Sequence, residues 1–420
     1  WQTGRILWAE GDSHDALDAY RRAVAILQIT RQETAYSYSR EDNSFEGSVG
    51  LVYQDLVDGL LRVAERSSND DTSNRLLLEA RDTVEMLKAA ELRDYFRDEC
   101  VADLEARAVS VESVSSDAAI IYPVFFPDRL ELLVSTASGL NRYTVPVGEA
   151  RLNDTIREFR RALQQPRTSA YLEPGQKLYR WLIAPYEDYL ESNGVTTLVF
   201  VPGGELRSVP MAALHDGRDF AIRKYALAVT PILALTDPQP LDRQDPRLLL
   251  AGISESVAGA APLPYVPGEL NAIQNLFGGR VLLDDGFTTT SFVQGMEDRE
   301  LDIVHIASHG VFTGDPDKSF LLTHDGRISM NELSNYIGRT RFRETPLELL
   351  VLSACETAIG DDRAALGLAG VAINAGARSA LGSLWAISDP ATARLIEGFY
   401  GELQDPNLTR AEALRRAQVS

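Results

Sequence analysis

The feature of this 420-residue sequence that most constrains its fold is an alternation of apolar strands and helices from about residue 245 onward. The runs RLLLAGIS, DIVHIAS and LELLVLSA are apolar almost throughout and predict buried strands. Helical patterns such as PGELNAIQNLFG and TTTSFVQGME, together with a further strand in RVLLDD, lie between them. Apolar strands that alternate with helices are typical of a parallel sheet covered on both faces. We therefore expect an α/β sandwich, mostly of parallel strands, over residues 245–420.

Two of these predicted strands lead to residues with nucleophilic chemistry. DIVHIASHG leads to His309 and Gly310, and LELLVLSACET leads to Cys355. Because functional groups of parallel sheets collect at the carboxyl ends of strands, the imidazole and the thiol face one crevice if the strands are neighbours. A thiol with a pKa near ~8.5 is mostly protonated at neutral pH, and an adjacent imidazole can take its proton. The amides of Gly310 and Cys355 could then form an oxyanion hole.

Each of these residues also has a structural interpretation. A cysteine at the end of a buried strand is often a small apolar side chain, and a single histidine is often structural. The pairing of the two favours the nucleophilic interpretation. We interpret His305 as a packed structural residue, because four residues of strand span ~13 Å, which is too far for His305 and His309 to hold one zinc ion.

The segment after the cysteine, ALGLAGVAINAGARSALGSLWAISD, predicts a helix of small residues, a glycine turn and another apolar strand. A strand beside the cysteine could pair with an extended substrate. Ser383 and Trp385 on this strand are therefore candidate substrate-binding residues. Asp389 is either an acceptor for a basic substrate side chain or the N-cap of a helix that starts at Pro390.

Residues 1–112 have helical patterns. GRILWAEGDSHDALDAYRRAVAIL is interrupted at Gly11-Asp12, and its small residues allow two antiparallel helices to approach with Tyr20 between them. This spacing resembles a tetratricopeptide repeat (TPR), whose period is about 34 residues. Further helices are predicted around 48–66, 72–90 and 91–108. Such arrays usually bind protein partners, so we expect a regulatory protein partner on these helices.

Residues 116–240 form a second predicted unit. AAIIYPVFFPDRLELLVSTASGLNRYTVPV indicates strands, two helices follow near 150–165 and 173–192, and TTLVFVPGGELRSVPMAAL contains an apolar strand. Its glycine-rich turn lacks the Lys-Ser/Thr pair and the three-glycine spacing of phosphate-binding loops. The Pro- and Asp-rich stretch 236–247 is the best linker to the third unit, residues 245–420.

Composition restricts the possible partners. The sequence has 41 Lys and Arg against 61 Asp and Glu, and this net charge of −20 argues against nucleic-acid binding. No stretch approaches eighteen uninterrupted apolar residues, so no membrane span is expected. Two cysteines predict neither a disulfide framework nor a paired-cysteine zinc site, and they favour the cytoplasm. The chain opens on Trp1, which indicates a fragment of a longer protein.

Taken together, HIASHG, LSACETA, AGARSALGSLWAISD and the following FY-x-x-L resemble the CHAT domain, a caspase-like peptidase domain often fused to TPRs. The resemblance runs from about residue 116 to 420, and VFVPGGELRSVPMAAL and PLPYVPGELNAIQNLF match its landmarks in order. His309 precedes Cys355 by 46 positions (355 − 309), against about 50 in caspases. Family members usually continue into a final strand beyond the position of LRRAQVS. Two interpretations stay open: a truncated edge that weakens the fold, or a sequence that simply stops at this point.

The resemblance implies a caspase-like α/β sandwich preceded by TPR-like helices, and a cysteine endopeptidase without a cofactor. His309 would be the general base and Cys355 the nucleophile, with the amides of Gly310 and Cys355 as the oxyanion hole. SACET replaces the caspase QAC pattern, so aspartate specificity does not carry over. In separase-like relatives an acidic residue at the position of Asp389 favours arginine. The alternatives are a non-catalytic adaptor and a Cys–His acyltransferase, although no cofactor pocket is recognisable for the latter.

Overall fold

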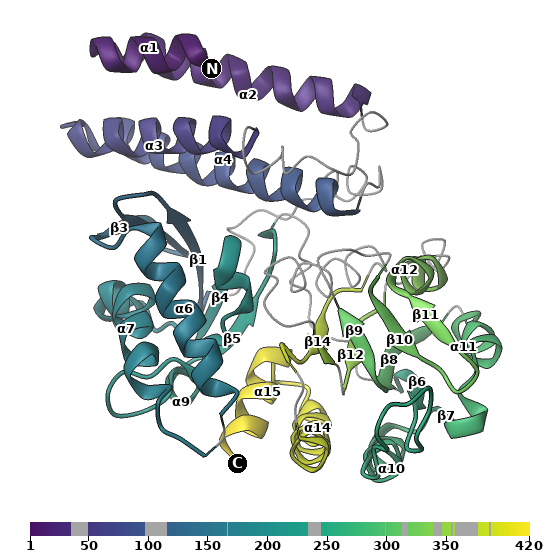
Figure 1. Ribbon diagram of the computed structural model, residues 1–420. Helices are drawn as coiled ribbons and strands as arrows, with labels where there is room; N and C mark the ends of the chain where they lie inside the picture. The colour runs from purple at the N-terminus through teal and green to yellow at the C-terminus, as the bar shows by residue number, and fades with distance from the viewer. Residues whose placement is uncertain are drawn as a thin grey trace.

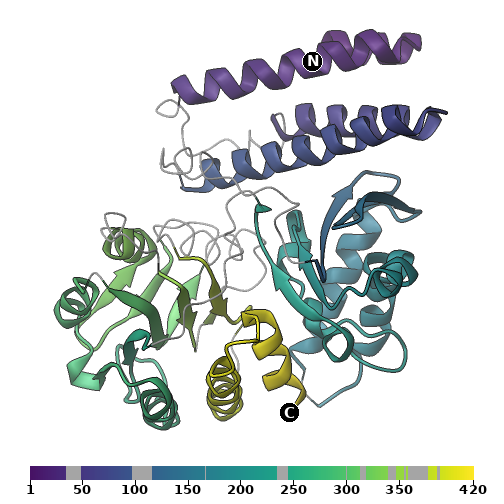
Figure 2. The same cartoon turned by 180° about the vertical axis from the view of Figure 1, so that it is seen from behind.

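The computed structural model describes residues 1–34, 49–96, 116–165, 167–233, 245–298, 300–312, 318–338, 347–353, 356–357, 377–385 and 388–420. They form two α/β halves side by side and a layer of long helices over the first half (Figure 1). Seen from behind, the C-terminal helix again lies between the two halves (Figure 2). The predicted α/β sandwich with preceding helices is therefore confirmed.

The described part of the helical layer contains α1 (Gln2–Glu10), α2 (Ser13–Thr34), α3 (Gly50–Arg66) and α4 (Asp70–Phe96). α1 and α2 form the predicted hairpin, and Gly11 ends α1 in the left-handed conformation. A Cβ added at Gly4 would lie 2.7 Å from the Tyr20 ring, so only glycine allows this close approach. The hairpin is confirmed, whereas its assignment as a TPR stays a prediction.

The first half is built on a mixed five-stranded sheet with the order β3-β2-β1-β4-β5. β1 pairs antiparallel with β2 and parallel with β4. Successive side chains along these strands point alternately into two hydrophobic cores, one on each face of the sheet. One face packs against α6, α7 and α8, and the other packs against α3 and α4. The helical layer thus shares a core with this sheet. The bounds are β1 (Ala118–Phe125), β2 (Leu130–Thr136), β3 (Gly139–Val145), α6 (Glu149–Leu163), α7 (Leu172–Leu182), α8 (Glu187–Ser192), β4 (Thr197–Phe200), α9 (Ala221–Lys224) and β5 (Ala226–Val229).

The second half contains the predicted parallel sheet, with the order β14-β12-β8-β6-β7. All of its described pairings are parallel. Leu350 and Leu352 face the helices α11 and α12, whereas Leu349 and Val351 face α10 and α14. The bounds are β6 (Arg247–Gly252), α10 (Val266–Phe277), β7 (Arg280–Leu283), α11 (Thr289–Met296), β8 (Leu301–Ala307), α12 (Met330–Gly338), β12 (Leu349–Leu352), β14 (Ala380–Gly382) and α14 (Asp389–Leu403).

A small sheet continues from the end of β8, with the order β11-β10-β9-β13. Its strands are β9 (Gly310–Phe312), β10 (Phe320–Leu322), β11 (Arg327–Ser329) and β13 (Glu356–Thr357). The last helix, α15 (Arg410–Val419), joins the two halves. It packs beside α14, and its Arg415 donates to the carbonyl oxygens of Ile222 and Arg223 in the first half, at 2.9 and 2.7 Å.

Two predicted helix boundaries are wrong. The helices expected at 72–90 and 91–108 are continuous through residue 96, because no glycine or proline interrupts α4 and Ala89-Ala90 favours helix. Conversely, the helix expected at 173–192 is broken into α7 and α8. Pro185 lacks an amide proton and clashes with the preceding turn, so the chain forms a 3-10 turn at Ala184–Tyr186.

The predicted domain boundaries adjoin residues 97–115 and 234–244, which lie outside the described residues. The division of the chain into three units therefore stays a prediction. Within the described part of the chain, no helix is both long and apolar enough to cross a bilayer.

Candidate functional site

The candidate site lies at the carboxyl edge of the second sheet, where the predicted residues were expected to meet. β8 and β12 are adjacent, with Ile306 paired with Leu352. His309 follows the first of these strands, and residues 353–355 follow the second. β14 lies on the other side of β12, so the strand predicted beside the cysteine is present. The condition that the two strands are neighbours is thus met.

Cys355 itself lies outside the described residues, and so does Ala354. The chain on each side of them is anchored beside the His309 segment. The Ser353 amide donates to the carbonyl oxygen of Ile306 at 2.9 Å, and Glu356 pairs with Val311 in a parallel ladder. The described residues nearest to Cys355 in sequence therefore pair with residues 306 and 311, on either side of His309.

Among the described residues, the ring of His309 has one hydrogen-bond partner, and this partner fixes which ring nitrogen carries a proton. Its Nε2 lies 2.7 Å from the carbonyl oxygen of Ala261. A carbonyl oxygen only accepts hydrogen bonds, so Nε2 must carry the proton. In the neutral ring, Nδ1 is then the nitrogen with a lone pair, which is the one that can act as a base.

The Ala261 carbonyl belongs to the loop after β6, and hydrogen bonds hold this loop at both of its ends. Pro262 follows Ala261 and restricts that residue to extended conformations, which limits the direction of its carbonyl group. At the start of the loop, the carboxylate of Asp284 accepts hydrogen bonds from the amide and hydroxyl of Ser254, at 2.6 and 2.8 Å. At its end, the Tyr265 amide donates to Oδ2 of Asp389 at 3.1 Å.

The amide of Gly310 points toward the side of β9 on which β13 lies. The carbonyl oxygen of His309 accepts from the Leu322 amide of β10, at 2.8 Å. In a trans peptide the carbonyl and the next amide point in opposite directions, so the Gly310 N–H points away from β10. β13 is the neighbour on that side, and it begins one residue after Cys355. This direction suits a donor to an oxyanion.

The candidate substrate-binding residues follow β14. Ser383 and Trp385 are half-buried, and the buried hydroxyl oxygen of Ser383 makes no hydrogen bond to a described residue. The same holds for Ser353, which is the next position in register on β12. Asp389 is the first residue of α14 rather than its N-cap, which is Ser388. Its Oδ2 accepts a hydrogen bond from the amide of Tyr265, the N-cap residue of α10.

Two parts of the site were not found from the sequence. Ala261 acts through its backbone carbonyl, which any residue could supply, and only the prolines that follow it, Pro262 and Pro264, hint at a fixed loop. Asp284 has a positive φ of 48°, and no sequence signal marks it as the residue that fastens the loop. Of the five histidines, His305 is fully buried, in agreement with its interpretation as a packed residue.

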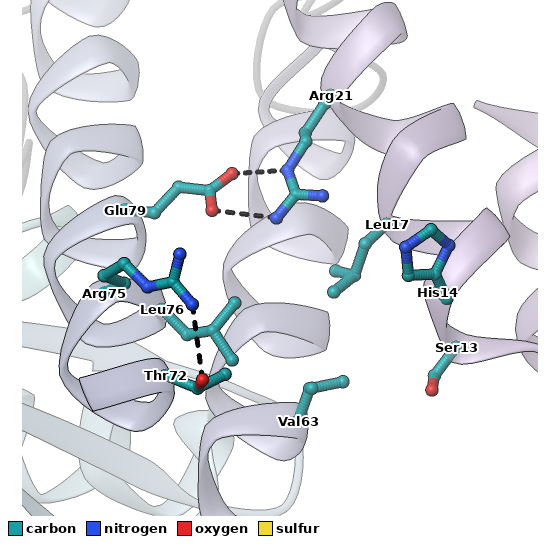
Figure 3. A pocket seen from close by; sticks show the side chains of 9 residues that line it. All are labelled: Ser13, His14, Leu17, Arg21, Val63, Thr72, Arg75, Leu76 and Glu79. Carbon is teal, nitrogen blue, oxygen red and sulfur yellow. Dashed lines mark hydrogen bonds and ion pairs between the residues drawn. The ribbon is translucent and has the colours of Figure 1, made fainter. Parts of the chain in front are cut away.

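Elsewhere in the molecule, the helical layer contains a pocket of about 390 Å³ (Figure 3). Figure 3 shows Arg21 and Glu79 joined across it by two hydrogen bonds of 2.6 and 2.8 Å. Leu17, Val63 and Leu76 line the apolar part, and Ser13, His14, Thr72 and Arg75 line the polar part. Within the described residues, no group of three or more His, Cys, Asp and Glu could hold a metal ion.

Comparisons with known proteins match the C-terminal part of the chain to one family. The model of the CHAT domain matches residues 172–420. A search of curated proteins finds no match. Among solved structures, the chain is similar to the Saccharomyces cerevisiae separase–securin complex, with 9% sequence identity and a TM-score of 0.40. That alignment covers 97% of this chain and 37% of the matched chain, so this chain spans little more than a third of that length.

Proposed function

Because this chain belongs to the CHAT domain family, whose members are caspase-like, we propose that it is a cysteine endopeptidase that cleaves protein substrates with His309 and Cys355 as a catalytic dyad. The observation that carries the proposal is the hydrogen bond from Nε2 of His309 to the Ala261 carbonyl. A base that is oriented by a third group is the arrangement that nucleophilic catalysis requires. The adjacency of β8 and β12 and the anchoring of Ser353 and Glu356 support the placement of a nucleophile near this base.

The proposed reaction follows from these roles. The Cys355 thiol gives its proton to Nδ1 of His309, and the sulfur attacks the carbonyl carbon of the substrate peptide bond. The oxyanion accepts hydrogen bonds from the amides of Gly310 and Cys355. The C–N bond then breaks, and the proton passes from His309 to the leaving amine. Water, deprotonated by His309, hydrolyses the thioester and restores the thiol. No cofactor enters these steps.

The first test is cleavage of a mixed peptide library, with products read by mass spectrometry. We expect cuts by the parent protein and none by Cys355→Ala. Cys100→Ala removes the only other cysteine of the sequence and is expected to leave the cuts unchanged. Identical cuts by parent and Cys355→Ala would contradict the proposal. Absence of cuts by the parent, with and without a bound partner, would favour the alternative of a non-catalytic adaptor.

We propose further that Asp389 favours a basic residue before the scissile bond. Its Oδ2 is bonded to the Tyr265 amide, and Oδ1 makes no hydrogen bond to a described residue. A charged hydrogen bond to a substrate guanidinium contributes about 1.5–3 kcal/mol, so Asp389→Asn should lower the preference for arginine over glutamine by about 10–100-fold.

Asparagine retains an oxygen that accepts from Tyr265, whereas Asp389→Ala removes both functions. In a paired series of peptides with arginine or glutamine, we expect Asp389→Asn to retain cleavage of the glutamine peptide and Asp389→Ala to weaken both. An arginine preference that survives in Asp389→Ala would refute this role.

We also propose that a regulatory protein partner binds the helical layer. The pocket between α2, α3 and α4, which is lined by apolar side chains and by the exposed Arg75 and His14, supports this part of the proposal. The net charge of −20 gives no support to a nucleic-acid partner. A cytoplasmic location, with the thiol kept reduced, is the setting in which the proposed nucleophile would work.

A further inference from the structure

The second half contains a buried polar cluster that the proposed chemistry does not use. It consists of His305 on β8, Glu269 on α10 and Tyr400 on α14, all of them buried. Nε2 of His305 lies 2.9 Å from Oε1 of Glu269, and its Nδ1 lies 3.3 Å from the Tyr400 hydroxyl. Both ring nitrogens therefore have partners, each on a different helix.

The cluster is satisfied when Nε2 of the His305 ring carries a proton. In the neutral form with Nε2 protonated, the ring donates to the Glu269 carboxylate and accepts from the Tyr400 hydroxyl. In the charged form it donates to both. Burial, with the nearby Glu269 charge, raises the pKa of Tyr400 well above its ordinary value, so the phenol keeps its proton. The three side chains thus link three separate elements by directional bonds.

These three elements are the ones that hold His309. β8 ends two residues before His309. α10 begins directly after the loop whose Ala261 carbonyl accepts from the His309 ring. α14 begins at Asp389, which accepts from the Tyr265 amide at the end of that same loop. The chain between His305 and His309 and the chain between Ala261 and Glu269 therefore form a closed circuit, with one hydrogen bond at each end.

Apolar packing alone would not fix this circuit as closely. Contacts between aliphatic side chains are non-directional, so α10 could slide along the sheet at little cost. A buried polar group that loses its partner is destabilised by about 1–3 kcal/mol, which opposes such a shift. Because a fixed α10 also fixes the loop before it, the direction of the Ala261 carbonyl depends on the cluster.

We propose that His305, Glu269 and Tyr400 are positioning residues that hold the proposed base in the form with Nε2 protonated and Nδ1 available. The inference rests on the proposed peptidase function for its kinetic consequences but not for its structural ones. The cluster lies one layer behind the reacting groups, and it acts through α10 and the Ala261 loop rather than on the substrate.

The test uses two conservative variants, Glu269→Gln and Tyr400→Phe. The matched control is Tyr186→Phe, which removes another fully buried tyrosine hydroxyl, bonded to the Leu182 carbonyl in the first half. Nitrogen chemical shifts of histidine-labelled protein report the tautomer of His309, assigned by its absence in His309→Ala. We expect a single Nε2-protonated form in the parent and in Tyr186→Phe, and a mixture of tautomers in both cluster variants.

In peptide cleavage, both cluster variants should lower kcat by about 10–100-fold, the range found when hydrogen-bond partners of metal-bound histidines are replaced, with KM within about two-fold. The midpoint pH of the acidic limb of the pH–rate profile should change in these two variants. In Tyr186→Phe it should be the same as in the parent. An equal loss of kcat in the control would mean general destabilisation and would overturn the inference. So would a folded Glu269→Gln protein with an unchanged His309 tautomer.

The tautomer measurement separates this inference from the proposed activity. If the parent cleaves nothing but the cluster variants still redistribute the His309 tautomers, the positioning role stands and the peptidase proposal fails. If the parent cleaves and the tautomer and kcat are unchanged in both variants, the peptidase proposal stands and the positioning role fails.

Discussion

Replacing Cys355 by alanine, His309 by alanine, or both together is expected to lower kcat/KM for peptide cleavage by roughly the same factor, about 10⁴ or more. The reason is that the two side chains act as one unit. Without the imidazole the thiol keeps its proton at neutral pH, and without the thiol the imidazole has no nucleophile to activate. Once either is removed, removal of the other should therefore matter little.

The measurement is kcat/KM of the parent, the two single variants and the double variant on one cleaved peptide. His215→Ala is the control for the histidine substitution, because His215 lies in the first half, where its Nδ1 accepts a hydrogen bond from the Gly217 amide. Its effect should stay within about two-fold. Two single losses that multiply in the double variant would contradict a dyad. A His309→Ala protein as active as His215→Ala would assign the base to another group.

The positions of the strands could be predicted from the sequence because burial on both faces leaves a direct pattern. Runs such as DIVHIAS and LELLVLSA have few polar residues, which is typical of central strands, and the structure places them side by side as β8 and β12. The position of His309 at the carboxyl edge follows from this pattern and from chain direction alone. The hairpin of α1 and α2 was predictable for a similar reason. The small residue Gly4 and the large residue Tyr20 are spaced so that one helix can pack closely against the other.

The partners of the site residues could not be predicted in this way. The group that orients His309 is a backbone carbonyl, and a carbonyl has no sequence signature. Glu269 looks like an ordinary residue of an amphipathic helix, and only the register of α10 on β8 brings its carboxylate to His305. The role of Asp389 was left open between a substrate contact and a cap for the same reason. Its bond to the Tyr265 amide joins residues 124 positions apart.

A buried carboxylate between the first sheet and the helical layer gives the second large expected effect. Glu131 on β2 is fully buried, and its two oxygens accept hydrogen bonds from Arg129, Arg142 and Thr144 at 2.6–2.8 Å. Both arginines also reach the helix α3. Arg129 pairs with Asp58, and Arg142 donates to the Leu61 carbonyl at 2.7 Å. Glu131 is thus a buried anion that two nearly buried guanidinium groups share.

Glu131→Gln should therefore lower the free energy of unfolding by about 3–5 kcal/mol, because it keeps the shape of the side chain and removes the buried charge that both guanidinium groups share. Arg129 then keeps only its pairs with Asp58 and Asp128, and Arg142 only the more distant Glu65 at 3.7 Å, among the described residues. Urea unfolding followed by circular dichroism measures the loss. Glu173→Gln, the same change in an exposed pair with Lys177, should leave the urea midpoint unchanged.

The pH dependence of this loss identifies charge as its cause. Burial alone would raise the pKa of Glu131, but the hydrogen bonds from Arg142 and Arg129 outweigh it and hold the pKa below its ordinary value. A carboxyl group with a lowered folded-state pKa stabilises the protein fully above the pKa of the unfolded chain, and this stabilisation is lost as the pH falls through the folded-state pKa. The glutamine cannot titrate, so the difference between parent and Glu131→Gln should be largest near about pH 7 and should shrink toward about pH 3. A difference that stays constant over this range would show that the side chain acts through its shape and hydrogen bonds rather than through its charge.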